Sequence, residues 1–243
     1  MSAVVYRTGE GNMSLGTFVG RQVRKPLELV EANFRKPTGW FGQMLGHIMT
    51  MQHKTLTVWV IDLMNVQPSD RVLDVGCGGG MAVKLLSDRA TAGFVAGVDY
   101  SAEMVRQATR RNDAAVRQGR VEVKPGDVSA LPYGEGSFDK VCGIETFYFW
   151  PDPMAGLREV HRVLKPGGQI TIAMEMSKES AAQKSRLQKY LSQRYANRSA
   201  ALGMSILSGV ELVTMLTQAG FRQARYHSEP NRALGWLCAL GSK

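Results

Sequence analysis

A glycine-rich turn is the feature of this sequence best suited to hold a ligand. Residues 72–80 read Val-Leu-Asp-Val-Gly-Cys-Gly-Gly-Gly, so a short apolar strand runs directly into glycines, and a helix is expected after them. Gly76, Gly78 and Gly80 can adopt positive φ angles and let a ligand approach the backbone closely. The helix N-terminus beyond them favours negative charge. Many nucleotide-binding α/β domains carry such a turn, and a tight turn that binds nothing is the alternative.

Two carboxylates follow the next two predicted strands. Asp99 stands where dinucleotide-binding folds place an acid on a ribose, about 20 residues beyond the first turn. Asp127 lies within residues 124–129, Lys-Pro-Gly-Asp-Val-Ser, where a carboxylate could accept the exocyclic amine of an adenine. Open α/β sheets bind ligands at the C-terminal ends of their parallel strands. We therefore expect the glycine turn and both acids to form one site.

The elements that must position these residues alternate between strand and helix. Strands are predicted at residues 71–75, 93–98, 121–124, 138–143, 169–175, 221–227 and 234–240. Helices are predicted at about residues 40–64, 81–89, 101–118, 153–164, 178–198 and 208–219, with Ser101 as an N-cap and residues 165–168, Lys-Pro-Gly-Gly, stopping the helix before them. This alternation predicts a mostly parallel sheet covered by helices on both faces.

Length, charge and cysteine content limit which classes of protein this chain can belong to. The chain has 243 residues, enough for one α/β domain, and a net charge of +9. That charge could serve an anionic substrate, nucleic acid or a membrane surface, or be a solvated basic surface, because no basic run occurs. No apolar run approaches the roughly 20 residues of a membrane span, and no secretory signal is seen. Three scattered cysteines, Cys77, Cys142 and Cys238, suggest neither disulfides nor a zinc site, so a cytoplasmic location is expected.

The sequence resembles class I S-adenosylmethionine-dependent methyltransferases of the methyltransferase type 11 group. The matching stretches are residues 72–80, 97–104, 126–132, 137–141 and 159–168, which together span about residues 70–175. A weaker likeness lies upstream, where residues 36–42 (Lys-Pro-Thr-Gly-Trp-Phe-Gly), Met51, His53 and Trp59 resemble the N-terminal segment of a largely uncharacterised bacterial and archaeal subgroup.

The resemblance implies that S-adenosylmethionine is the cofactor and that it binds at the ends of the first three strands. The implied cofactor-binding residues are Asp74, Gly76, Cys77, Gly78, Gly80, Asp99, Tyr100, Met104, Gly126, Asp127, Val128 and Glu145. The glycines would surround the methionine part, and Asp74 would orient their loop or the cofactor's ammonium group. Asp99 would bind the ribose.

At the adenine end, Tyr100 and Met104 would pack near the base, and Asp127 with the backbone of Val128 would read its edge. Carboxylates also suit a cationic sulfonium ligand, whereas a dinucleotide pyrophosphate prefers positive potential at the first turn. The motif departs from the dinucleotide pattern as well, because Met81 stands where that pattern has a glycine. The resemblance implies a Rossmann-like three-layer sandwich with a mostly parallel seven-stranded sheet and an antiparallel last strand.

A general base is needed only if the acceptor arrives protonated. Glu145, just past the fourth predicted strand, and His53, on the N-terminal helix, are the catalytic candidates; a loop carboxylate and a structural histidine are the alternatives. Aromatic side chains can wall a substrate pocket or simply pack the next helix. The candidate substrate residues are Trp40, Phe147, Tyr148 and Trp150.

The expected function is methyl transfer to a small-molecule acceptor. Residues 1–65 would form an N-terminal helical lid, and residues 66–243 the cofactor-binding domain, with a helical insertion at about 177–207. A nucleic-acid methyltransferase is an alternative motivated by the charge, but residues 144–147, Ile-Glu-Thr-Phe, lack the Asn or Asp followed by two prolines and an aromatic that base-amino methyltransferases usually carry. A non-catalytic cofactor-binding subunit is another alternative. No metal, nucleic acid or membrane span is expected, and a homodimer is possible.

Overall fold

The computed structural model describes residues 54–178, 206–232 and 235–243. Most of the predicted lid, including Trp40 and His53, lies outside these residues, as does most of the predicted insertion. None of the helices within the described ranges combines the length and the apolar content that crossing a bilayer requires.

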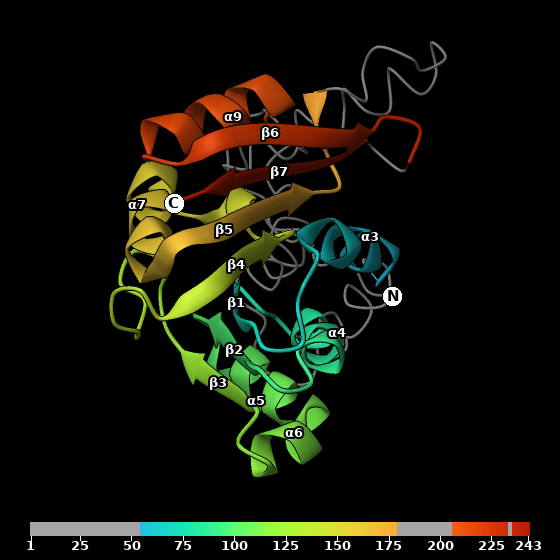
Figure 1. The fold of residues 1–243 in the computed structure, drawn as a ribbon. Helices are drawn as coiled ribbons and strands as arrows, with labels where there is room; N and C mark the ends of the chain where they lie inside the picture. The colour runs from blue at the N-terminus through green and yellow to red at the C-terminus, as the bar shows by residue number, and fades with distance from the viewer. Residues whose placement is uncertain (1–53, 179–205, 233–234) are drawn as a thin grey trace, which may run out of the picture.

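Seven strands form one sheet in the order β3-β2-β1-β4-β5-β7-β6 (Figure 1). The strands are β1 (Arg71–Val75), β2 (Phe94–Asp99), β3 (Val121–Pro125), β4 (Phe138–Ile144), β5 (Leu164–Met174), β6 (Arg222–Glu229) and β7 (Trp236–Ser242). Neighbours from β3 through β5 pair in parallel, while β7 is antiparallel to both β5 and β6. The predicted parallel sheet with an antiparallel last strand is confirmed.

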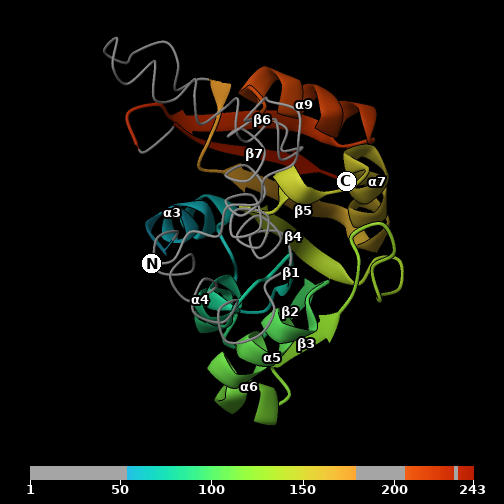
Figure 2. The same ribbon diagram turned by 180° about the vertical axis from the view of Figure 1, so that it is seen from behind.

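Helices cover both faces of the sheet, as the two opposite views show (Figures 1 and 2). They are α3 (Lys54–Met64), α4 (Met81–Arg89), α5 (Ala102–Arg111), α6 (Asp113–Arg117), α7 (Pro153–Val163) and α9 (Gly209–Gln218). One core lies between the sheet and α3, α4 and α5, and the other between the sheet and α7 and α9. Val72 enters the first core and Leu73 the second, because successive side chains of a strand point to opposite faces. The result is the predicted three-layer sandwich.

The predicted helix 101–118 is wrong as one piece. Ser101 caps it as predicted, since its hydroxyl accepts the N–H of Met104 at 3.5 Å. The helix then breaks at Asn112, which separates α5 from α6. The Asn112 amide donates to the carbonyls of Ala108 (2.8 Å) and Gly80 (3.1 Å). A side chain that bonds nearby backbone competes with helix continuation, and here it also ties α5 to the glycine turn.

The second correction concerns residues 165–168. The helix does end before them, as predicted, but the strand predicted from residue 169 already begins at Leu164 and includes them. The strand begins directly at the helix end, and its pairing with β4 shifts register between Phe138 and Lys140. This irregularity lets the Pro-Gly-Gly segment stay in the sheet without regular pairing, as bulges do.

Candidate functional site

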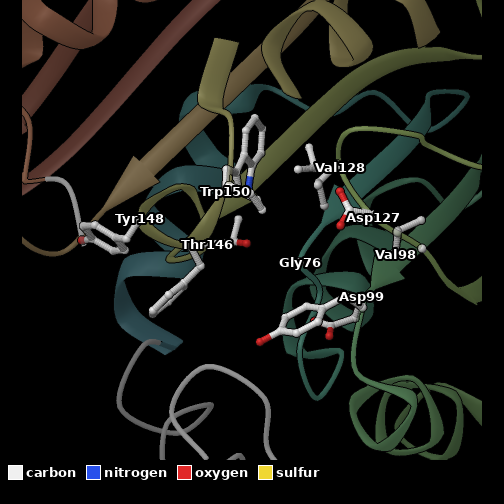
Figure 3. Close-up of a pocket in the computed structure, with 13 residues that line it drawn as sticks. Gly76, Val98, Asp99, Asp127, Val128, Thr146, Tyr148 and Trp150 are labelled. Carbon is white, nitrogen blue, oxygen red and sulfur yellow. The ribbon is translucent and has the colours of Figure 1, made fainter. Parts of the chain in front are cut away.

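The loops after four neighbouring strands surround a cavity of about 330 Å³ at the C-terminal edge of the sheet (Figure 3). Its lining comes from the ends of β1, β2 and β3 and from the loop after β4: Val75, Gly76, Val98, Asp99, Tyr100, Gly126, Asp127, Val128, Thr146, Tyr148, Phe149, Trp150 and Pro151. Segments far apart in the chain thus meet where the parallel topology predicts a ligand site.

The glycine turn after β1 is held by the neighbouring strand. The backbone N–H groups of Gly76 and Cys77 both donate to the carbonyl of Val98, at 2.7 and 3.0 Å. A Cβ on Gly80 would lie 2.7 Å from Cα and Cβ of Ala108 on α5, so this glycine is required for packing. A Cβ on Gly78, by contrast, would meet no atom within 4 Å. The space around Gly78 is therefore open, but Gly76 is the glycine of this turn that lines the cavity, and Gly78 and Gly80 are not among the lining residues.

Asp99 belongs both to the turn and to the cavity. Its Oδ2 accepts the Gly78 N–H at 2.9 Å, and its Oδ1 accepts the Ser101 N–H at 2.8 Å. Burial raises the pKa of Asp99, and these two backbone hydrogen bonds oppose that shift. An ionised carboxylate has about four acceptor positions, so two remain for a ligand. Two free acceptor positions on one carboxylate match the two hydroxyls of a ribose.

Asp127 presents a second acceptor across the cavity. Its Oδ1 accepts both the N–H and the hydroxyl of Ser129, at 2.8 and 2.7 Å. These hydrogen bonds lower the pKa of Asp127, so it stays ionised and oriented. Tyr100, which is 46% exposed, lines the same cavity. The two acids and the Tyr100 ring thus line one space, and this combination suits a nucleoside.

Asp74 lies beneath the glycine turn and does not line the cavity. It is 2% exposed, its Oδ1 accepts a weak hydrogen bond from the Cys142 thiol at 3.6 Å, and its Oδ2 has no partner among the described residues. Burial raises the pKa of Asp74 to about 7. Two other sequence-predicted cofactor residues, Cys77 and Met104, are also buried outside the lining. All three can support the site from behind rather than touch a ligand in this arrangement.

The loop after β4 turns sharply at Glu145, whose φ of 59° is in the left-handed region. Its carboxylate accepts the N–H of Glu175, at the end of β5, and the hydroxyl of Tyr148 at 3.4 Å. The Tyr148 oxygen in turn accepts the N–H of Met176 at 3.1 Å. Burial raises the pKa of the Tyr148 hydroxyl well above its usual value, so it remains a donor. This network fastens the cavity wall to the end of β5.

Of the candidate substrate aromatics, Tyr148 and Trp150 line the cavity, whereas Phe147 is 1% exposed and packs against Trp150 in the core. Glu145 is not among the lining residues. Within the part of the chain that the structure describes, no group of three acidic, histidine or cysteine side chains is arranged to hold a metal.

Several residues at the site were missed from the sequence. Thr146 and Pro151 line the cavity, and Arg111 donates to the carbonyl of Gly79 at 2.7 Å, beside the Asn112 contact with Gly80. The position of Thr146 directly after the fourth strand could have drawn attention to it. Arg111 and Asn112 carry no local signal, since only the packing of α5 brings them to the turn.

The residues present fit S-adenosylmethionine. The open backbone at Gly78, the two remaining acceptor positions on Asp99 and the oriented carboxylate of Asp127 match the amino-acid, sugar and base parts of that molecule. The carboxylates of Asp99 and Asp127 in the cavity lining also suit its positive charge.

Comparison with known proteins agrees with this geometry. The family model "Methyltransferase domain" matches residues 73–172. The putative methyltransferase YrhH of Bacillus subtilis is 31% identical over 122 residues, which cover 50% of this chain and 67% of YrhH. The demethylmenaquinone methyltransferase of Staphylococcus epidermidis is 32% identical over 154 residues, or 62% of this chain and 61% of that enzyme. The curated relatives differ in size, and the chain spans from 32% of one to 74% of another.

Among solved structures, a putative methyltransferase of Haloferax volcanii, in complex with the activator Trm112, superposes with a TM-score of 0.69 and 25% identity. The match covers 84% of this chain and 95% of that one. The matched family model spans the strands and loops that form the cavity, from β1 into β5. The chain belongs to the class I S-adenosylmethionine-dependent methyltransferases.

Proposed function

We propose that this protein transfers a methyl group from S-adenosylmethionine to a small-molecule acceptor. The observation that carries the proposal is the shared cavity, in which the glycine turn, Asp99 and Asp127 face one space whose far wall is aromatic. When bound, the cofactor supplies a methyl group already activated on a sulfonium. The protein's contribution is then orientation and exclusion of water.

Each loop has a proposed role in holding the donor. The backbone at Gly78 lies along the methionine part, and Asp99 accepts the ribose hydroxyls with the two acceptor positions that its backbone hydrogen bonds leave open. Asp127 and the backbone of Val128 bind the adenine edge, and Tyr100 covers the base. Asp74 acts from below: burial raises its pKa to about 7, and a cation bound at the turn would favour its charged form.

The acceptor is proposed to lie against Tyr148, Phe149 and Trp150. This wall favours an organic molecule with an apolar or flat part. The relative named demethylmenaquinone methyltransferase, which bears the name of a small-molecule substrate, supports this class. Glu145 and His53 are the proposed bases for a protonated acceptor. For Glu145 that role requires its carboxylate to turn from the Glu175 and Tyr148 donors toward the cavity, which it does not line.

The test is to incubate the full chain with methyl-labelled S-adenosylmethionine and, separately, with metabolite, RNA and protein fractions of a bacterial extract. The proposal expects label in the low-molecular-weight fraction. Label in RNA with none in metabolites would overturn it and favour the nucleic-acid alternative.

A second candidate is activity that depends on a partner. It is favoured by the Haloferax volcanii neighbour, which was solved in complex with an activator. This candidate expects the purified chain to bind the donor but to turn over only when an activator protein is added. Turnover by the chain alone contradicts it.

A cytoplasmic location is also proposed. The three cysteines are free and buried, which suits a reducing compartment.

A further inference from the structure

The hydroxyl of Thr146 occupies a distinctive place in the cavity wall. Thr146 is half-buried, lines the cavity, and points its hydroxyl toward the side where Gly76 lies (Figure 3). A Cβ on Gly76 would overlap that hydroxyl, so the two residues are in direct contact. Among the hydrogen bonds of the described residues, none uses the Thr146 hydroxyl. It is therefore a polar group held at the turn with its hydrogen-bonding capacity unused.

The orientation of this hydroxyl is set by its surroundings. On the strand side, a Cβ on Gly143 would lie 3.1 Å from the Thr146 methyl carbon Cγ2, so that methyl group packs over Gly143. A β-branched side chain has few χ1 choices, and seating the methyl there leaves the oxygen toward Gly76. The backbone is fixed as well, because the Thr146 carbonyl accepts the Phe149 N–H at 2.9 Å.

Glu145, the residue before Thr146, also helps to fix the position of Thr146. Glu145 takes a left-handed conformation, and its carboxylate is bonded to the end of β5. Strained backbone of this kind persists only where surrounding contacts enforce it, and it clusters at functional sites. The turn at Glu145 therefore positions Thr146 where the loop after β4 contacts the loop after β1.

We infer that the Thr146 oxygen contacts the positively charged sulfonium end of the methyl donor and distinguishes the donor from its demethylated product. This inference rests on the proposed placement of the donor, with its adenosine between Asp99 and Asp127 and its sulfur toward the loop after β4. A hydroxyl oxygen carries partial negative charge, and its attraction for a cation is strengthened where water is excluded. The product has a neutral sulfur, so the same oxygen gives it no such attraction. Asp99 and Asp127 face the adenosine part, which donor and product share.

The inference is tested by calorimetric titration of the full chain with S-adenosylmethionine and with S-adenosylhomocysteine. The variants are Thr146→Val, which replaces the hydroxyl by a methyl group, Thr146→Ser, which keeps the hydroxyl, and Thr214→Val as a control. Thr214 is exposed on α9, where its hydroxyl bonds the Val210 carbonyl. Thr146→Val is expected to lower the affinity for the donor relative to the product by about 2- to 10-fold. Thr214→Val is expected to keep the wild-type ratio, and Thr146→Ser, which keeps the hydroxyl but lacks the methyl group that seats it, is expected to stay closer to the wild-type ratio than Thr146→Val does.

An unchanged ratio in Thr146→Val overturns the inference, whether both affinities fall together or neither changes. Should that variant fail to fold, Thr146→Ala removes the same hydroxyl without adding a methyl group, and the same ratio decides. The titration needs no acceptor, so failure of the small-molecule proposal, seen as unlabelled metabolites, is distinguishable from failure of this one.

Discussion

The carboxylate of Asp99, at the end of β2, accepts a hydrogen bond from the backbone N–H of Gly78, in the turn after β1, at 2.9 Å. One side chain therefore fixes the glycine turn and faces the cavity beside it. The position of the turn therefore affects the orientation of the carboxylate that a ligand would bind. This coupling explains why two loops from separate strands can act as a single binding surface.

The two glycines at 78 and 80 should respond differently to alanine. Both have positive φ, which costs an alanine roughly 1–2 kcal/mol. Gly80→Ala adds a collision with Ala108, so its total cost should be roughly 2–5 kcal/mol. Gly78→Ala meets open space and should instead weaken donor binding, because its methyl group enters the space for the ligand. Urea unfolding and calorimetry measure the two effects. Equal stability of the two variants would contradict this assignment.

Stability should fall with rising pH because of Asp74. Its pKa is about 7 in the folded protein, against 3.8 for an ordinary aspartate. Between these values the folded chain binds more protons than the unfolded chain, so the free energy of unfolding decreases as pH rises and levels off above about 7. The full effect is on the order of 4 kcal/mol.

Asp74→Asn carries no charge and should lose this slope. Relative to wild type, it should be more stable at about pH 8 than at about pH 5, as measured by urea unfolding. Asp88→Asn, at an exposed position on α4, is the control. A stability difference for Asp74→Asn that is the same at both pH values would show that burial does not disfavour the charge.

Tyr148→Phe should loosen the wall of the cavity. The change leaves the Met176 N–H without its acceptor and removes a donor from Glu145. Losing a buried partner of this kind costs about 1–3 kcal/mol. The matched control is Tyr226→Phe, since Tyr226 is 40% exposed on β6. Thermal and urea unfolding should separate the two variants, and indistinguishable curves would argue against the network.

The sequence was most informative where the signal is local. Neighbouring residues alone predict the strand and glycines of residues 72–80, the Ser101 cap and the acids after β2 and β3. The structure confirms the cap and places the end of this strand and both acids at one cavity. The break at Asn112 was missed although its hydrogen bond to the Ala108 carbonyl is local; its second hydrogen bond, to Gly80, comes from 32 residues away in the chain and has no local signal.

The loop after β4 shows the same limit at the site itself. Its aromatic residues were visible, but their division between core and cavity was not, because consecutive residues of a short helical turn face different directions. Phe147 enters the core while Thr146 and Tyr148 reach the cavity. The left-handed backbone of Glu145 has no signature in its residue type, and the Glu175 N–H that its side chain accepts is 30 residues away in the chain.

The most direct test of the converging loops is calorimetric titration of the wild-type chain and of Asp99→Asn with S-adenosylhomocysteine, with Asp88→Asn as the control. Wild type and the control should bind one equivalent of the ligand, and Asp99→Asn should bind at least about 10-fold more weakly while remaining folded, because a carboxylate that accepts two ribose hydroxyls is replaced by an amide. Absence of binding by the wild type, or undiminished binding by a folded Asp99→Asn, would contradict the account.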